Sequence, residues 1–371
     1  MPDKLTQLGS CHRALHKKRP WLAVNWKTTI LIAVVTLLLY RVQSSESTWR
    51  ASVGSEASSI CVKGKYLYVG TLGSGIVVLD KGSGRRVRTI PIDNARGIVT
   101  SRSGDKLYIG LDNSVCAVSS DTGSVLWTAA ADAWPRFCLS EDESVVYLSD
   151  EKLRAIDSRN GADLWSVNTN KAALTNLIFH NGAVYASTQS QVFAVGSIDH
   201  KVRWHVDKGC DNRAMCLCDE LLVFDDPEFG LQALDAQSGK NIWQLQPGHG
   251  GRGFPFKGPL GTLIVATSSG WVYQINPQNK QYIWITDTMA AIDVPSVLGR
   301  EGLYAAGGVG NLAILNSNSG ILSKRVWLSS ILDRFSITNS RLVVQCTSAM
   351  STDTNGCVYV GTTYGTVYFI K

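Results

Sequence analysis

The feature that most constrains this chain is a repeat of about 40 residues. One copy reads ALDAQSGKNIWQ, from Ala233 to Gln244. In this copy a Gly follows the Asp after four residues and a Trp follows it after eight. The stretch predicts a β-hairpin, because the Asp carboxylate can accept a turn hydrogen bond and the Gly tolerates a positive φ. The aromatic and β-branched residues after the Gly favour the return strand.

The same hairpin recurs seven times along the chain. Its Asp position recurs every 38 to 41 residues and is occupied by Asp80, Ser119, Asp157, Gly196, Asp235, Asn276 and Asn316. Four residues later stand Gly84, Gly123, Gly161, His200, Gly239, Lys280 and Gly320. Eight residues later stand Arg88, Trp127, Trp165, Trp204, Trp243, Trp284 and Lys324, and in the last copy the Trp has moved to Trp327. The four-residue and eight-residue offsets recur although the residues between them vary, which indicates an internal repeat.

A repeat of this length with four short strands predicts one blade of a β-propeller. A four-stranded sheet cannot bury both of its faces alone, so blades stack face to face in a ring. A Trp side chain can bury about 150–250 Å² between neighbouring blades and needs one acceptor for its indole N–H. We therefore predict structural roles for Trp49, Trp127, Trp165, Trp204, Trp243, Trp284 and Trp327.

Closure of the ring is predicted from the two ends of the repeat region. An eighth strand core, CVYVGTT at 357–363, is followed by TVYFI at 366–370, and the outer strand of that blade is missing. STWRASV at 47–53 can supply it, because Trp49 precedes Tyr68 by 19 residues, close to the 20 that separate Trp127 from Tyr147. The sequence thus predicts an all-β, eight-bladed propeller over residues 43–371, closed by its N-terminal strand. Trp327 to Tyr359 spans 32 residues, which predicts an insertion in blade 8 around STDTNG.

The pattern Ala-x-Asp-x-x-x-Gly-x-x-x-Trp resembles the tryptophan-docking repeat of quinoprotein-type (PQQ-like) eight-bladed propellers, over roughly residues 47–371. That family includes quinone-dependent alcohol dehydrogenases. It also includes non-enzymatic members, such as a bacterial outer-membrane assembly lipoprotein and the luminal sensor domains of endoplasmic-reticulum stress kinases. The resemblance implies the fold and leaves two functions open, because a fold does not fix a function.

The residues favour a binding scaffold over a quinone-dependent dehydrogenase. The dehydrogenases of the family are typically much longer, and many carry an adjacent Cys–Cys pair that this chain lacks. GHGGRG at 248–253 matches G-x-G-x-x-G but precedes FPF rather than a helix pattern, so we interpret it as an inter-blade loop. We predict no cofactor and no metal site; PQQ and the dehydrogenase reaction are the alternative.

Cysteine use gives weaker expectations. Cys116 and Cys138 lie in strand patterns and are expected as small buried residues. Cys210, Cys216 and Cys218 cluster, but no second pair of metal ligands follows at the usual spacing. Cys346 and Cys357 flank the expected insertion, where a bridge between them is one option.

The N-terminus predicts membrane targeting. Residues 1–41 hold seven basic residues and one acidic residue, so the net charge of +6 lies there and the rest of the chain is neutral. A neutral propeller argues against nucleic acid as a partner. The apolar run at 28–40, extended back to Trp21, can span a bilayer, and the basic residues before it place the N-terminus in the cytoplasm. We predict a cytoplasmic tail (1–20), a signal-anchor helix (21–42) and a propeller on the far side; a secreted protein, cleaved after Ser44, is the alternative.

One set of residues predicts a binding site. In five of the eight links between blades an Arg stands just before the inner strand: Arg96, Arg136, Arg213, Arg252 and Arg334. In a propeller these links lie on one face, where a ring of guanidinium groups would favour a carboxylate, a phosphate or an acidic peptide of a protein partner. Trp134 and His249 lie in the same links and can add stacking or hydrogen bonds. The alternative is that each Arg pairs with a nearby acid, of which Asp93, Asp132, Asp211 and Asp333 are candidates.

Overall fold

The computed structural model describes residues 47–371, apart from 133, 150, 169–175, 209–214, 290, 293, 308–309 and 329–345. The chain separates into two units, Met1–Gln43 and Ser44–Lys371, and all described residues belong to the second. The predicted tail (1–20) and the predicted membrane segment (21–42) lie outside the described residues. Within the described ranges, no helix is both long enough and apolar enough to cross a bilayer.

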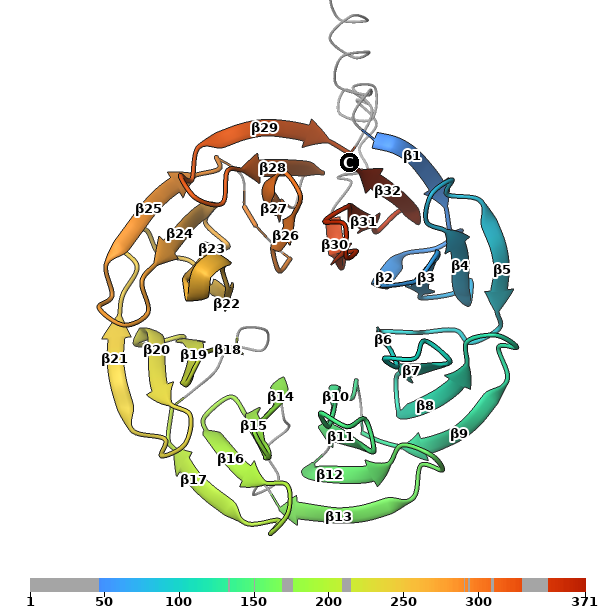
Figure 1. Ribbon diagram of the computed structural model, residues 1–371, viewed down its shortest axis with the longest axis horizontal. Helices are drawn as coiled ribbons and strands as arrows, with labels where there is room; N and C mark the ends of the chain where they lie inside the picture. The colour runs from blue at the N-terminus through green and yellow to red at the C-terminus, as the bar shows by residue number, and fades with distance from the viewer. Residues whose placement is uncertain are drawn as a thin grey trace, which may run out of the picture. The chain divides into compact units, whose positions relative to one another are not determined.

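Eight four-stranded antiparallel sheets, or blades, form a closed ring (Figure 1). Blade 1 comprises β2 (Ala57–Lys63), β3 (Tyr66–Thr71), β4 (Ile76–Asp80) and β5 (Arg86–Ile90). Blade 2 comprises β6 (Gly97–Thr100), β7 (Lys106–Gly110), β8 (Ser114–Ser119) and β9 (Val125–Ala130). Blade 3 comprises β10 (Phe137–Leu139), β11 (Val145–Ser149), β12 (Lys152–Asp157) and β13 (Asp163–Asn168). Blade 4 comprises β14 (Asn176–His180), β15 (Ala183–Ser187), β16 (Val192–Gly196) and β17 (Val202–Val206).

The other half of the ring repeats this arrangement. Blade 5 comprises β18 (Met215–Cys218), β19 (Leu221–Asp226), β20 (Gly230–Asp235) and β21 (Asn241–Leu245). Blade 6 comprises β22 (Gly253–Lys257), β23 (Leu263–Thr267), β24 (Trp271–Ile275) and β25 (Tyr282–Asp287), with the short 3₁₀ helix η1 (Pro259–Gly261) between its first two strands. Blade 7 comprises β26 (Val297–Gly299), β27 (Gly302–Ala306), β28 (Asn311–Leu315) and β29 (Leu322–Trp327). Blade 8 comprises β30 (Cys346–Thr352), β31 (Val358–Thr362), β32 (Thr366–Ile370) and β1 (Ser47–Ser52). The predicted eight-bladed fold is confirmed.

The apolar core lies between the blades rather than inside any one of them. One buried cluster joins Tyr68 and Val78 of blade 1 to Leu107 and Ile109 of blade 2. Each neighbouring pair around the ring has a cluster of this kind. A single blade therefore has no core of its own, and the ring is stable because each sheet buries both faces against its neighbours.

The N-terminal strand closes the ring, as predicted. β1 pairs antiparallel with β32, and Trp49 lies opposite Phe369. The Trp49 ring lies 5.7 Å from that of Phe369 and 6.0 Å from that of Tyr359, measured between centroids. Blades 8 and 1 are further joined by an ion pair between Lys81 Nζ and the buried Asp353 Oδ2, at 2.9 Å. Residues far apart in the sequence thus hold the ring shut.

Tryptophan docking between blades explains why the two offsets of the repeat recur. The indole N–H of Trp204 donates to Ala236 O in the next blade, at 3.0 Å. Trp49, Trp127, Trp243 and Trp284 donate in the same way to Lys81, Ser158, Pro277 and Ser317, each one residue after the Asp position. Gly239 lies against the Trp204 ring, and a Cβ there would stand 2.6 Å from an indole carbon. The Gly is therefore required by packing as well as by its φ of +70°.

The copies of the repeat that lack the Gly or the Trp keep the same turn but make a different contact with the next blade. Non-glycine residues adopt the positive φ in two of them, 57° at His200 and 61° at Lys280. Trp165 stacks on the His200 ring, with centroids 4.7 Å apart. Arg88, which replaces the Trp in blade 1, donates from Nη1 to Asp121 O in blade 2. The side chain of Trp327 lies outside the described part of the chain.

The insertion in blade 8 is not where the sequence predicted it. STDTNG, residues 351–356, ends β30 and enters a five-residue turn, residues 353–357, which equals in length the turn at 101–105 in blade 2. Asp353 Oδ1 accepts hydrogen bonds from the N–H groups of Asn355 and Cys357, which makes this turn compact. Eighteen residues, 328–345, separate β29 from β30, whereas nine, 288–296, separate β25 from β26. The extra residues therefore precede β30.

Every cysteine thiol that the structure describes is free: Cys61, Cys116, Cys138, Cys216, Cys218 and Cys357. The bridge considered between Cys346 and Cys357 is not formed, because Cys357 carries a free thiol. Cys116 is buried, as expected, and burial raises the pKa of its thiol to about 11. The Cys116 thiol therefore stays protonated at neutral pH and serves as a small core residue.

Candidate functional site

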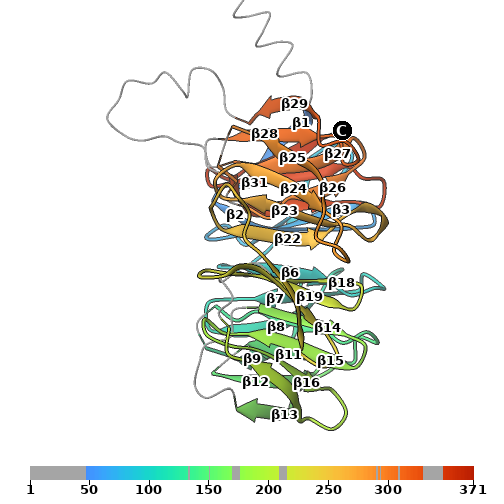
Figure 2. The same ribbon diagram turned by 90° about the vertical axis from the view of Figure 1, so that its left-hand side faces the viewer.

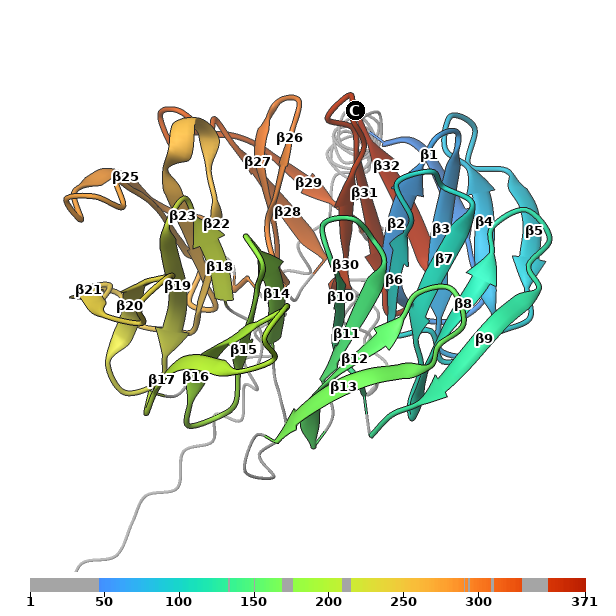
Figure 3. The same cartoon turned by 60° about the horizontal axis from the view of Figure 1, so that its bottom comes forward.

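The links between blades gather on one face of the ring. The strands run across the thickness of the ring (Figure 2), and the first strand of each blade lies nearest the ring axis, as β6, β10, β14 and β18 do in Figure 3. Since neighbouring strands alternate in direction, each link between blades lies on the same face as the turns between second and third strands. We call this the link face.

Three of the five predicted arginines are described, and all three stand in links on this face. Arg96 lies between β5 and β6, Arg136 between β9 and β10, and Arg252 between β21 and β22; all three are exposed. Arg213 and Arg334 lie outside the described residues. The described arginines therefore stand in links on one face, and an arginine ring that binds a partner stays a prediction.

Arg96, Asp112 and Trp134 form a compact group that we call the Trp134 cluster. Arg96 Nε lies 2.6 Å from Asp112 Oδ1, and the guanidinium carbon lies 5.0 Å from the centre of the Trp134 ring. Trp134 donates its backbone N–H to Asp112 O at 2.7 Å. Its side chain is 64 % exposed, and its φ is +60°. An exposed Trp is thus fixed in an uncommon backbone conformation, a feature typical of functional loops.

The acid that pairs with Arg96 is not the one expected from the sequence. Asp93 was the nearby candidate, but its Oδ1 accepts a hydrogen bond from the N–H of Gly75 instead. Asp112 stands in the turn between β7 and β8, which the fold brings beside the link. Arg136 is held through its backbone, because its N–H donates to Ser149 Oγ at 2.5 Å. Both links are therefore anchored to the turn or strand end beside them.

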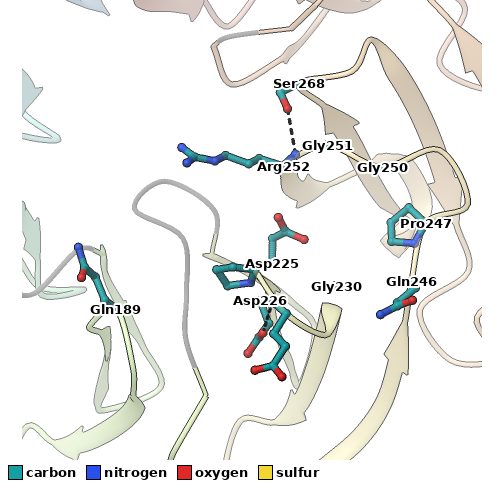
Figure 4. Close-up of a pocket in the computed structure, with 12 residues that line it drawn as sticks. Gln189, Asp225, Asp226, Gly230, Gln246, Pro247, Gly250, Gly251, Arg252 and Ser268 are labelled. Atoms are coloured by element: carbon teal, nitrogen blue, oxygen red, sulfur yellow. Dashed lines mark hydrogen bonds between the residues drawn. The ribbon is translucent and has the colours of Figure 1, made fainter.

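A pocket of about 790 Å³ opens on the link face at blades 4 to 6 (Figure 4). The end of β19 contributes Asp225 and Asp226, and the turn between β19 and β20 contributes Glu228. The link between β21 and β22 contributes Gly250, Gly251 and Arg252, and turns of blades 4 and 6 contribute Gln189 and Ser268. Of the residues predicted for the site, Arg252 lines this pocket.

Backbone donors fix the two buried carboxylates of the pocket. Asp225 Oδ2 accepts the N–H of Gly253 at 2.7 Å. Asp226 Oδ1 accepts the N–H groups of Glu228 and Phe229, at 2.9 Å and 3.0 Å. On the opposite wall, Arg252 donates its N–H to Ser268 Oγ at 2.9 Å. The walls are therefore set by main-chain hydrogen bonds before any ligand arrives.

His249 stands beside the pocket rather than in its lining. Its ring stacks on Trp271, with centroids 3.7 Å apart and planes 8° apart. The GHGGRG stretch around it is a loop that leads directly into the strand β22 rather than into a helix. The interpretation of GHGGRG as an inter-blade loop is confirmed, and the His249 stack holds this loop against blade 6.

Sequence reasoning missed the acidic residues of the pocket, although a signal was present. By strand register, Asp225 and Asp226 occupy the positions of Gly70 and Thr71 in blade 1. Two acids in place of small residues mark blade 5 as different from the rest of the ring. No group of three or more His, Cys, Asp or Glu side chains is placed to hold a metal ion anywhere in the described ranges.

The comparisons with known proteins agree with this architecture. A family model described as outer membrane protein assembly factor BamB matches residues 74–216. The crystal structure of the computationally designed protein Ika8 shares 14 % identity with this chain, covers 88 % of it and 99 % of the designed chain, and gives a TM-score of 0.71. BamB from Moraxella catarrhalis shares 15 % identity, covers 69 % of this chain and 82 % of its own, and gives a TM-score of 0.54. No curated protein sequence matches.

At these identities the solved structures show the fold alone. Together with the family model they confirm the predicted resemblance to PQQ-like propeller repeats. This chain is therefore an eight-bladed β-propeller whose repeats resemble those of PQQ-like propellers.

Proposed function

We propose that this protein is a scaffold that binds a protein partner through its link face. The observation that carries the proposal is the Trp134 cluster, in which an exposed Trp lies over an Arg in a fixed link. Trp and Arg are the residue types most enriched among the few residues that dominate binding energy at interfaces. The similarity to a protein named as an assembly factor supports the same function.

The partner segment at this cluster is acidic. Arg96 and Asp112 are both partly exposed, and exposed ion pairs contribute only about 0–1 kcal/mol, so a partner carboxylate can replace Asp112 at little cost. Arg136 lies exposed in the next link and would add a second positive charge. Guanidinium groups suit carboxylates because they can form two parallel hydrogen bonds.

The test is capture of a partner from detergent-solubilised membranes by the tagged full-length chain. Trp134→Ala should weaken capture about 30-fold, the effect of losing a residue worth about 2 kcal/mol. Ile198→Ala is the matched control, because Ile198 is 86 % exposed but stands in the turn between β16 and β17, on the opposite face. Equal capture by the two variants would contradict the proposal.

We propose that residues 21–42 anchor the chain as a single span, with the N-terminus in the cytoplasm and the propeller on the other side. The basic tail and the apolar run support this topology. A protease applied to sealed vesicles should remove the tail and spare the propeller. Release of the full-length protein by a carbonate wash would contradict the anchor and favour secretion.

The scaffold needs no cofactor. Purified protein incubated with quinone and Ca²⁺ should develop no cofactor absorbance band, whereas a stoichiometric band would favour the dehydrogenase alternative.

A further inference from the structure

The pocket on blades 4 to 6 carries a charge opposite to that of the arginine links. Asp225, Asp226 and Glu228 supply three negative charges, and Arg252 is the one positive residue in the described lining. The lining is otherwise made of Gln, Ser, Pro and Gly. A concave surface with a negative charge excess concentrates cations, because its walls focus the field into the cavity.

Asp226 has an unused hydrogen-bond acceptor at this site. The residue is only 3 % exposed, and it lines the pocket. Both of its hydrogen bonds end on Oδ1, so no donor from the described residues reaches Oδ2. Two backbone N–H groups already stabilise the carboxylate through Oδ1, and Oδ2 can accept a further, charge-assisted hydrogen bond from the pocket side. A ligand that brings an N–H donor and a positive charge to Oδ2 would supply what the protein does not.

Close packing of the backbone sets two edges of the pocket. Gly230 and Gly251, at two of its edges, adopt φ values of +73° and +87°. A Cβ at Gly251 would stand 2.8 Å from Ser269 N, and a Cβ at Gly230 would stand 2.9 Å from Leu245 O. The loops therefore approach their neighbours as closely as glycine allows. A pre-formed cavity of this kind loses little conformational entropy when a ligand binds.

We infer that this pocket binds the guanidinium or ammonium group of an Arg or Lys side chain from the protein partner. The volume of about 790 Å³ exceeds one side chain and leaves room for the flanking backbone. An organic cation fits better than a metal ion, since the described acids do not converge as metal ligands. This inference rests on the proposed scaffold function and deepens it: the partner segment presents an acid to the Trp134 cluster and a basic side chain to this pocket.

The direct test is binding of a capped peptide, acetyl-Gly-Gly-Arg-Gly-Gly-amide, to the full-length protein in a neutral detergent. The matched peptide carries citrulline, which keeps the shape of Arg without its charge. The Arg peptide should bind at least about tenfold more tightly in saturation-transfer NMR, because hydrogen bonds to charged groups are the stronger class. Asp226→Asn should remove that difference, since Asn keeps the Oδ1 acceptor of the turn and replaces Oδ2 by a donor.

Two further variants distinguish binding in the pocket from a general attraction of the Arg peptide to acidic residues. Glu56→Gln neutralises another acid on the link face, in the link before β2, and should leave the tenfold preference unchanged. Glu228→Gln, at an exposed residue, gives a second pocket variant if Asp226→Asn fails to fold. Equal binding of the two peptides, or an unchanged preference in both pocket variants, would overturn the inference.

Two further outcomes identify the source of the cation. Spermidine that binds more tightly than the Arg peptide would overturn a protein side chain as the ligand, in favour of a free polyamine. Binding of the Arg peptide through Asp226, combined with unchanged partner capture by Trp134→Ala, would support the pocket and overturn the contact proposed for the Trp134 cluster. The two proposals can therefore fail separately.

Discussion

Replacing Trp49 by Ala should weaken the closure of the ring. Trp49 is the outer-strand Trp of blade 8, and its ring packs on Tyr359 and Phe369 of the same blade. Across the blade boundary it lies against Gly84 and donates its indole N–H to Lys81 O at 3.0 Å. One side chain therefore joins the first strand of the fold to its last blade and to blade 1.

The magnitude follows from these contacts. Trp49 is partly buried, so the loss of about 100–150 Å² of buried apolar surface costs about 2.5–4 kcal/mol. The lost hydrogen bond adds about 1 kcal/mol, which brings the total to about 3.5–5 kcal/mol, within the usual range for Trp→Ala in a packed site. Unfolding entropy of about 2.1 cal/mol/K per residue over about 325 residues then predicts a fall in Tm of about 5–7 °C.

Differential scanning calorimetry of the full-length protein measures this change. Trp134→Ala serves as the control, because Trp134 is 64 % exposed and its loss should shift Tm by less than about 1 °C. Deletion of residues 47–53 should destabilise more than Trp49→Ala, since it also exposes the edge of β32. A melting curve unchanged by the deletion would refute closure by β1.

Three further predictions concern the turns, pH and the arginines. Gly239→Ala should destabilise by about 2–4 kcal/mol in urea, because its Cβ would meet the Trp204 ring, whereas Gly64→Ala, at a φ of +57° with no atom within 4 Å, should cost about 1 kcal/mol. Burial opposes ionisation of Asp353, but hydrogen bonds from Lys81 and from the N–H groups of Cys357 and Asn355 lower its pKa below the usual value. Its stabilising effect is therefore present above pH about 4 and lost as pH falls further, and Asp353→Asn should flatten the decline in Tm below that pH. Replacing Arg136 and Arg213 together by Ala should weaken partner capture most at low salt and leave Tm unchanged.

The sequence predicted the ring well because the spacing of residues in the repeat reflects the length of its turn and the position of its Trp. The offset from Asp235 to Gly239 is the length of one hydrogen-bonded turn, in which the Gly239 N–H donates to Asp235 O at 2.8 Å. The offset to Trp243 sets where the indole reaches the next blade. His200 keeps the same turn without glycine, because a hydrogen bond to Gly196 O at 3.0 Å holds it. The distance from Trp327 to Tyr359 gives only the total number of residues in two successive connections. It does not tell which connection is longer, so the insertion before β30 was assigned to the wrong one.

The candidate site was predictable in part. Chain order alone placed the arginine links on one face, since strand direction alternates within each blade. The pairing of Arg96 with Asp112 was not predictable, because the acid comes from a turn that the fold brings beside the link. The pocket around Asp226 was missed for the same reason: its walls come from loops of three blades, and sequence separation does not tell which loops meet.

The most direct test of the central claim is photo-crosslinking from the two faces of the ring. A photoreactive phenylalanine analogue replaces Trp134 on the link face or Ile198 on the opposite face, in full-length protein in native membranes. Both side chains are exposed, at 64 % and 86 %, so probe accessibility is matched. We predict a discrete protein adduct from position 134 and none from position 198. Equal adducts from both positions, or an adduct from position 198 alone, would contradict a partner bound to the link face.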